Sequence, residues 1–190
     1  MKKSLLGIVA IVGLLAGSAQ AANFSYTGTL NDPNDVQTFN FSVGAPSTVT
    51  LRTWSYAGGT NAAGSVIAGG GFDPILALFN SAGAKIGEND DGGCGLVAAG
   101  PNCWDTYFSS ALGAGNYTVS VAAFSNFAGA TITDPFQGGG SFSGRTSAWA
   151  FDLLNVGSAT QIGNNVPEPG SMALLGLGLA GLAFARRRKN

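Results

Sequence analysis

Apolar and polar residues alternate along several short segments in the middle of the chain. Residues 38–43, 116–121 and 148–153 each place an apolar side chain at every second position. A period of two gives a strand one buried and one solvated face, which is typical of antiparallel sheets. Turn residues bound five further segments that we expect to be strands, namely 24–30, 48–56, 75–80, 85–88 and 106–111.

No segment between residues 22 and 166 has a helical period. Short strands separated by Gly-rich turns predict an all-β fold, an antiparallel β-sandwich of the jelly-roll type, over residues 22–156. Two Gly-rich inserts, 57–71 and 129–144, contain few large apolar residues and are expected to be long surface loops. The polar residues 157–166 are expected to form a linker.

Residues 1–21 have the order of a secretory signal peptide. Lys2 and Lys3 precede a twelve-residue apolar stretch, and Ala19 and Ala21 supply the small residues that a signal peptidase requires. The apolar stretch is too short to span a membrane, which argues against a permanent anchor at this end. We therefore expect export of the chain and cleavage after Ala21.

A second tripartite pattern lies at the C-terminal end. Pro167, Glu168 and Pro169 precede fifteen uncharged residues, 171–185, which we expect to form a transmembrane helix. A basic tail, 186–189, follows this segment and consists of Arg186, Arg187, Arg188 and Lys189. Because basic flanks stay on the cytoplasmic side of a membrane, this orientation leaves the preceding residues outside.

This order resembles the PEP-CTERM sorting signal of exported bacterial proteins, which we place at residues 167–190. The resemblance implies recognition by an exosortase, a membrane-embedded transpeptidase-like enzyme, and cleavage near the Pro-Glu-Pro motif, with loss of the hydrophobic tail. It also implies a bacterium that makes exopolysaccharide. The protein is then expected at the cell surface or outside the cell, held in the inner membrane by its C-terminal helix only before processing. An ordinary C-terminal anchor is the alternative.

The composition removes several functional classes. The chain has no histidine, which excludes Ser-His-Asp and Cys-His catalytic sites and imidazole metal ligands. Residues 22–166 contain three basic and nine acidic residues, a net charge of −6. An acidic domain without a basic patch is a poor match for nucleic acid. We therefore expect a protein that is not an enzyme and that binds no nucleic acid.

The middle of the domain has a characteristic order of strand and turn motifs. An Asp-Pro-led hydrophobic strand at 73–79 is followed by an Asn-Asp-Asp turn at 89–91 and a Gly-x-Tyr-x-Val strand at 115–119. This order is similar to that of bacterial pre-peptidase C-terminal (PPC) domains over residues 35–124, although the inserts 57–71 and 94–103 depart from the family. The resemblance implies a non-catalytic jelly-roll sandwich of secreted and surface proteins, sometimes calcium-modulated or matrix-binding.

Cys94 and Cys103 are the only cysteines of the chain. An even number of cysteines in an exported protein favours a disulfide. The bond would staple the insert between the two residues and contribute about 2–3 kcal/mol of stability. A two-thiolate metal site is the alternative, but without histidine it lacks further ligands.

Acidic and aromatic residues near turns are the candidates for ligand binding. Asp73, Asp90 and Asp91 carry the oxygen ligands that calcium prefers, although Asp residues also simply form turns. Trp54 and Trp104 lie near strand ends, where an indole face suits the sugar rings of an exopolysaccharide, although aromatic residues on strands are more often core. We expect a structural or adhesive protein of the extracellular polysaccharide (biofilm) matrix. A carbohydrate-binding module, with or without calcium, is the alternative.

Overall fold

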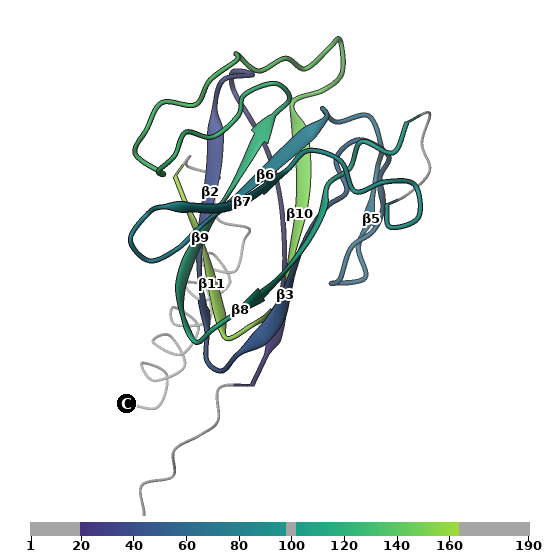
Figure 1. Cartoon of the computed structure of the whole chain (residues 1–190). Coiled ribbons are helices and arrows are strands. Elements are labelled where there is room, and N and C mark those ends of the chain that lie inside the picture. The colour runs from purple at the N-terminus through teal and green to yellow at the C-terminus, as the bar shows by residue number, and fades with distance from the viewer. Residues whose placement is uncertain (1–19, 98–101, 164–190) are drawn as a thin grey trace, which may run out of the picture.

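The computed structural model describes residues 20–97 and 102–163, which form two antiparallel sheets packed as a sandwich (Figure 1). The four-stranded sheet contains, in spatial order, β1 (Ala22–Thr29), β10 (Ala148–Val156), β3 (Ser47–Thr53) and β8 (Tyr107–Leu112). The five-stranded sheet contains β11 (Ser158–Ile162), β2 (Val36–Val43), β9 (Gly115–Ala123), β6 (Pro74–Phe79) and β7 (Lys85–Asn89). The expected all-β sandwich is therefore confirmed.

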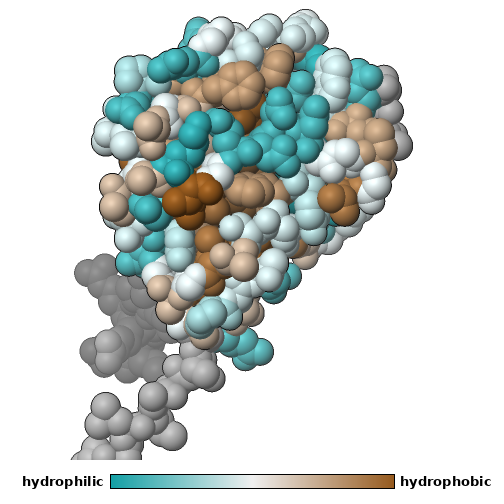
Figure 2. Space-filling model, viewed as in Figure 1, coloured by the Kyte–Doolittle hydropathy of each residue, from teal (hydrophilic) through white to brown (hydrophobic). Residues whose placement is uncertain are grey.

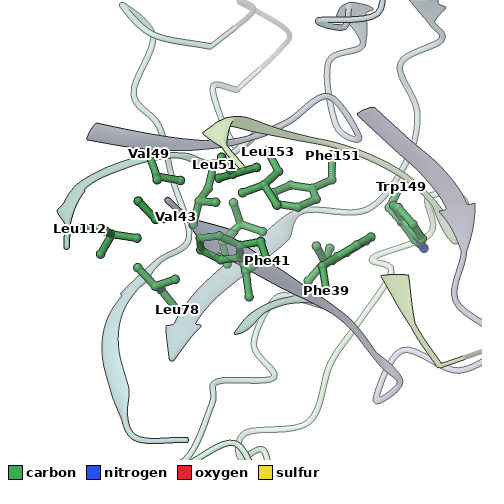
Figure 3. Packing of buried hydrophobic residues seen from close by; sticks show 14 of the residues in the cluster. Phe39, Phe41, Val43, Val49, Leu51, Leu78, Leu112, Trp149, Phe151 and Leu153 are labelled. Atoms are coloured by element: carbon green, nitrogen blue, oxygen red, sulfur yellow. The ribbon is translucent and has the colours of Figure 1, made fainter. Parts of the chain in front are cut away.

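The core lies between the two sheets and is built from the inward-facing halves of the alternating strands. Phe39 and Phe41 of β2 face Leu51 of β3 and Phe151 of β10 (Figure 3). The ring of Phe39 is fully buried, with its centroid 5.0 Å from that of Phe151 and 5.8 Å from that of Trp149. Such tilted and edge-on aromatic pairs add to the stabilisation from apolar burial.

All six residues of β6 are buried, so this strand departs from the alternation. Its inner side contributes Leu76 and Leu78 to the core. Its outer side is covered by the second insert (129–144) and the residues just before it. Ala128, Ile132 and Phe136 pack there on Ala77 and Phe79. A strand that is covered on both faces has a continuous apolar run in its sequence, as β6 has.

The first insert (57–71) and the expected linker both contain strands. Inside the first insert, β4 (Gly59–Thr60) and β5 (Val66–Ile67) form a short hairpin. The expectation that 157–166 is a linker was wrong for its first part, because β11 pairs with β2 there. The polar sequence misled because an edge strand is held largely by main-chain and polar contacts: the Ser42 and Ser158 hydroxyls lie 2.7 Å apart.

Within residues 20–97 and 102–163 we find no helix with the length and apolar character needed to cross a membrane. The expected transmembrane helix at 171–185, the sorting residues 167–169 and 186–189, and the signal peptide up to Ala19 lie outside the described residues. On the face seen in Figure 2, hydrophilic residues separate several apolar patches.

Candidate functional site

The acidic residues singled out from the sequence meet at one end of the five-stranded sheet. Asp73 directly precedes β6, and Asp90 and Asp91 directly follow β7. Because β6 and β7 are antiparallel, with Leu76 opposite Asn89, the start of one strand lies beside the end of the other. The fold therefore brings the three predicted calcium ligands into one neighbourhood.

Asp73 has an unusual electrostatic environment. The pKa of its carboxyl is raised to about 7, first because burial penalises the charged form. The negative charges of Asp91, Asp90 and Asp105 raise this pKa further, and the Arg145 guanidinium opposes them. The Oδ1 atom of Asp73 is buried and has no hydrogen-bond partner among residues 20–97 and 102–163. Burial and the charge of Asp90 also raise the pKa of Asp91.

Among residues 20–97 and 102–163, no three His, Cys, Asp or Glu side chains are grouped in a way that could hold a metal ion. Asp73, Asp90 and Asp91 influence one another's charge without forming such a group. Calcium binding therefore stays a prediction from the sequence. What the geometry provides is a half-buried carboxyl whose protonation changes near neutral pH.

Asp105 lies at the same end of the sandwich and holds the chain that leaves β3. Its buried carboxylate accepts hydrogen bonds from the Thr53 hydroxyl at 2.9 Å and from the backbone N–H groups of Tyr56 at 3.0 Å and Ala57 at 2.8 Å. Three donors satisfy the charge and fix the start of the first insert. Sequence reasoning missed this role because an Asp beside a predicted strand has the same signal as a turn residue.

Trp104 is the exposed member of an aromatic pair beside these acids. Its side chain is 39% exposed, and its ring centroid lies 5.0 Å from that of the buried Tyr56. The Arg145 guanidinium lies 3.7 Å from the Tyr56 ring centroid and its Nε donates to the Gly71 carbonyl at 2.6 Å. Asn102 donates to the Tyr56 hydroxyl at 3.2 Å. This arrangement presents an indole on a rigid support, a surface on which a sugar ring can stack.

The predicted disulfide between Cys94 and Cys103 is present and no free cysteine is found in the described part of the chain. The bond joins the turn after β7 to the segment that leads into β8, with the two Cα atoms 5.0 Å apart. Because Trp104 follows Cys103 directly, the disulfide helps to fix the exposed indole beside Tyr56.

Trp54, the other predicted stacking residue, is occupied by contacts inside the protein. The Arg52 guanidinium lies 3.7 Å from its ring centroid. Its Nε1 donates to Asp152 at 2.7 Å. Gly59 lies against the ring so closely that a Cβ there would be 2.7 Å from Cε3. Of the two predicted tryptophans, Trp104 is therefore the more accessible to a ligand.

Asp152 organises the outer face of the four-stranded sheet. Its buried carboxylate accepts hydrogen bonds from the Ser25 hydroxyl, the Trp54 indole and the backbone N–H of Ala62 at 2.8 Å. The alternation at 148–153 suggested a solvated position, but the first insert covers this face. No local signal in the sequence identifies the residue, because its burial depends on where a distant insert folds.

Comparison with models of protein families identifies a sorting motif at the C-terminal end. Residues 165–189 match the model of the PEP-CTERM protein-sorting motif, which includes the predicted sorting residues 167–169 and 186–188. No curated protein matches the chain. The resemblance to PPC domains is not confirmed. The motif indicates an exported, cell-surface-directed protein and implies processing by an exosortase. The chain therefore carries a PEP-CTERM sorting motif after a β-sandwich, as expected of an exosortase substrate.

Proposed function

We propose that the mature protein is a non-enzymatic structural or adhesive component of the extracellular polysaccharide matrix. The observation that carries this proposal is the PEP-CTERM motif at 165–189, which follows an acidic β-sandwich. The absence of histidine from the whole chain favours a role in binding over one in catalysis. Acidic residues without a basic patch favour a neutral or cationic polymer over an anionic one.

The short distance between the domain and the motif keeps the folded domain near the site of processing. Because β11 ends at Ile162, only residues 163–166 separate the sandwich from Pro167. Four residues span at most about 14 Å even when fully extended. The folded domain would therefore stand close to the membrane when the exosortase cuts, and release would leave only a short tail on the sandwich.

Removal of the motif tests the proposal. In the native host, we expect the full chain in the surface and matrix fraction and a variant that lacks residues 165–190 in the culture medium. Replacement of Arg186, Arg187 and Arg188 by Ala in the full chain serves as a milder variant and should also reduce surface recovery. An unchanged distribution of all three forms between matrix and medium would contradict the proposal.

Carbohydrate binding through Trp104 is a second candidate function. The observation that favours it is the 39% exposed indole supported by Tyr56 and held by the neighbouring disulfide. Aromatic faces contribute strongly to binding when a ligand covers them. The acids near this end offer acceptors for sugar hydroxyl groups.

Binding of the host's extracted exopolysaccharide by the purified protein tests this second function. Trp104→Ala should weaken saturable binding at least about tenfold, equal to about 1.4 kcal/mol. Ile162→Ala, at a 43% exposed position on the edge strand β11, is the control and should bind normally. Absence of saturable binding, or equal binding by Trp104→Ala, would remove the candidate.

A further inference from the structure

The strands at the edges of the two large sheets differ in how other parts of the molecule protect them. Strand β7, at one edge of the five-stranded sheet, carries the Lys85–Glu88 ion pair. The backbone N–H of Lys85 also donates to the Ala130 carbonyl of the second insert at 2.8 Å. Charged side chains and a covering loop are two of the ways in which proteins keep an edge strand from pairing with another chain. The edge at β7 is therefore protected.

Strand β8 lies beside β7 on the same side of the sandwich, at the front in Figure 1. The Asn89 side chain of β7 donates to the Tyr107 carbonyl of β8 at 3.1 Å. Gly87 of β7 lies so close to Phe108 of β8 that a Cβ there would be 2.3 Å from the ring. These contacts join the two sheets at the beginning of β8.

Strand β1 lies at the opposite edge of the four-stranded sheet and lacks these protections among the described residues. It is the longest of the four edge strands described, with eight residues, and it contains no charged residue and no proline. Apart from the ladder with β10, no backbone group of residues 22–29 makes a backbone hydrogen bond within residues 20–97 and 102–163. An edge strand of this kind presents a row of unpaired N–H and C=O groups, which another extended strand can satisfy.

The two faces of β1 favour a second copy of the same strand as the partner. Phe24 and Tyr26 pack against the core while staying partly exposed, and the Tyr26 ring centroid lies 4.7 Å from that of Phe39. Thr27 and Thr29 are exposed on the other face. A copy related by a two-fold axis would place its aromatic residues beside this aromatic row and its threonines beside this polar row. Cross-strand aromatic pairs and Thr pairs both stabilise a sheet.

The charge of the domain also favours β1 as the contact between copies. Residues 22–166 carry a net charge of −6, so two copies repel each other over most of their surfaces. Strand β1 has no charge of its own. The nearest carboxylate of the paired strand β10, that of Asp152 opposite Ser25, is buried and accepts three hydrogen bonds. Pairing through β1 therefore places no like charges of the paired strands opposite each other.

We propose that two copies of the mature protein associate through β1, with the two strands antiparallel about a two-fold axis. The two four-stranded sheets would join into one sheet of eight strands, which would cover the partly exposed rings of Phe24 and Tyr26. The contact closes after two copies, because both β1 edges are then occupied. One strand from each copy buries less than the roughly 1,200 Å² of a stable interface, so we expect a dissociation constant of about 100 μM. This inference goes beyond the proposed matrix role and does not depend on it.

Sedimentation equilibrium of the secreted, processed protein from about 10 μM to about 1 mM tests the proposal. We expect the average mass to rise with concentration toward that of a dimer and no further. Amide hydrogen exchange should slow in residues 22–29 over the same range, and the β8 edge, residues 107–112, should exchange at an unchanged rate. A protein that stays monomeric at about 1 mM, that grows beyond a dimer, or that slows exchange at β8 instead would overturn the proposal.

A lysine at the edge provides the matched variants. Thr27→Lys adds a charge at an exposed position of β1 and should weaken the dimer at least about tenfold, because an edge lysine opposes strand pairing. Ala111→Lys adds the same charge at an exposed position of β8, the opposite edge of the same sheet, and should dimerise like the wild type. Melting curves check that both variants fold, and the exchange data on the wild type decide the matter if Thr27→Lys does not. Equal dimerisation of the two folded variants would overturn the proposal.

Failure of this proposal leaves the matrix role intact, because that role is tested by surface recovery rather than by self-association.

Discussion

The two Gly-rich inserts cover the two sheets in different ways. The first insert (57–71) is held by directional hydrogen bonds to two buried carboxylates, Asp105 at its start and Asp152 beneath it. The second insert (129–144) has no buried carboxylate beneath it among the described residues; it is held by apolar contacts of Ile132 and Phe136 on β6 and by backbone hydrogen bonds such as that from the Ile132 N–H to the Gly83 carbonyl. The Lys85–Glu88 ion pair adds two hydrogen bonds to Ala128 beside it.

This difference predicts different sensitivities to substitution. A carboxylate that accepts several hydrogen bonds stabilises one geometry, and its loss leaves several buried donors unpaired at once. An apolar cover loses stability roughly in proportion to the area removed from contact. The first insert should therefore respond sharply to single polar changes, and the second should respond gradually to changes in side-chain volume.

Asp152→Ala should have the largest effect. The substitution leaves the Ser25 hydroxyl, the Trp54 indole and the Ala62 N–H without their acceptor. We expect the free energy of unfolding, measured by urea denaturation, to fall by about 3–4 kcal/mol. The matched control is Asp134→Ala in the second insert, where the carboxylate accepts only the Thr131 N–H, and where the loss should stay below about 1 kcal/mol. Equal losses would remove the distinction between the inserts.

Loss of the disulfide should have the next largest effect, because the insert 94–103 is held in a third way, by a covalent bond. Replacement of both Cys94 and Cys103 by Ala should lower the free energy of unfolding by about 2–3 kcal/mol. Reduction of the wild-type protein should give a similar loss in the same denaturation experiment. Unchanged stability in both cases would show that the bond does not restrict the chain.

Phe136→Ala tests the apolar cover. The half-buried ring packs on the outer side of β6, so its removal should cost about 2 kcal/mol, less than for a fully buried Phe. Phe136→Leu keeps much of the contact and should cost about half as much. Equal effects of the two variants in urea denaturation would contradict a cover that depends on contact area.

Asp73→Asn should have the smallest effect, and one that depends on pH. The folded-state pKa of about 7 lies above the ordinary value of 3.8, so the folded protein binds this proton more tightly than the unfolded chain does. Wild-type stability should therefore fall as the pH rises from about 4 to about 7. The variant should match the wild type near pH 4 and be more stable by about 1–2 kcal/mol at pH 8, after allowance for solvent screening.

Melting curves of the wild type and Asp73→Asn over this pH range test the prediction. A difference in stability that is constant with pH would contradict it.

Melting the wild-type protein with calcium and then with EDTA tests the predicted calcium site. Calcium at 100 times its dissociation constant would stabilise the fold by about 2.7 kcal/mol. A melting temperature that is the same in calcium and in EDTA would contradict the predicted calcium site.

Local patterns predicted much of the fold. The alternation at 38–43, 116–121 and 148–153 identified β2, β9 and β10, because burial on one face is recorded residue by residue in such strands. The disulfide between Cys94 and Cys103 was also predicted correctly, because two cysteines in an exported protein favour a disulfide bond. Strand β11 was missed because an edge strand of polar residues has the composition of a linker.

The candidate site was predicted less well, because its properties depend on contacts between distant segments. Trp54 and Trp104 look alike in the sequence, but contacts with Arg52, Asp152 and Gly59 occupy the indole of Trp54, whereas that of Trp104 stays exposed. The roles of Asp105 and Asp152 likewise depend on donors that lie about fifty to more than a hundred residues away in sequence. Such pairings leave no local pattern.

The intact mass of the protein recovered from outside the cell tests the central claim most directly. A substrate sorted through the motif at 165–189 should begin at Ala22 and end near Pro167–Pro169. We predict a mass that lacks residues 170–190, with or without an added group at the new C-terminus. A secreted or surface-bound protein that still carries Arg186–Lys189 would contradict it.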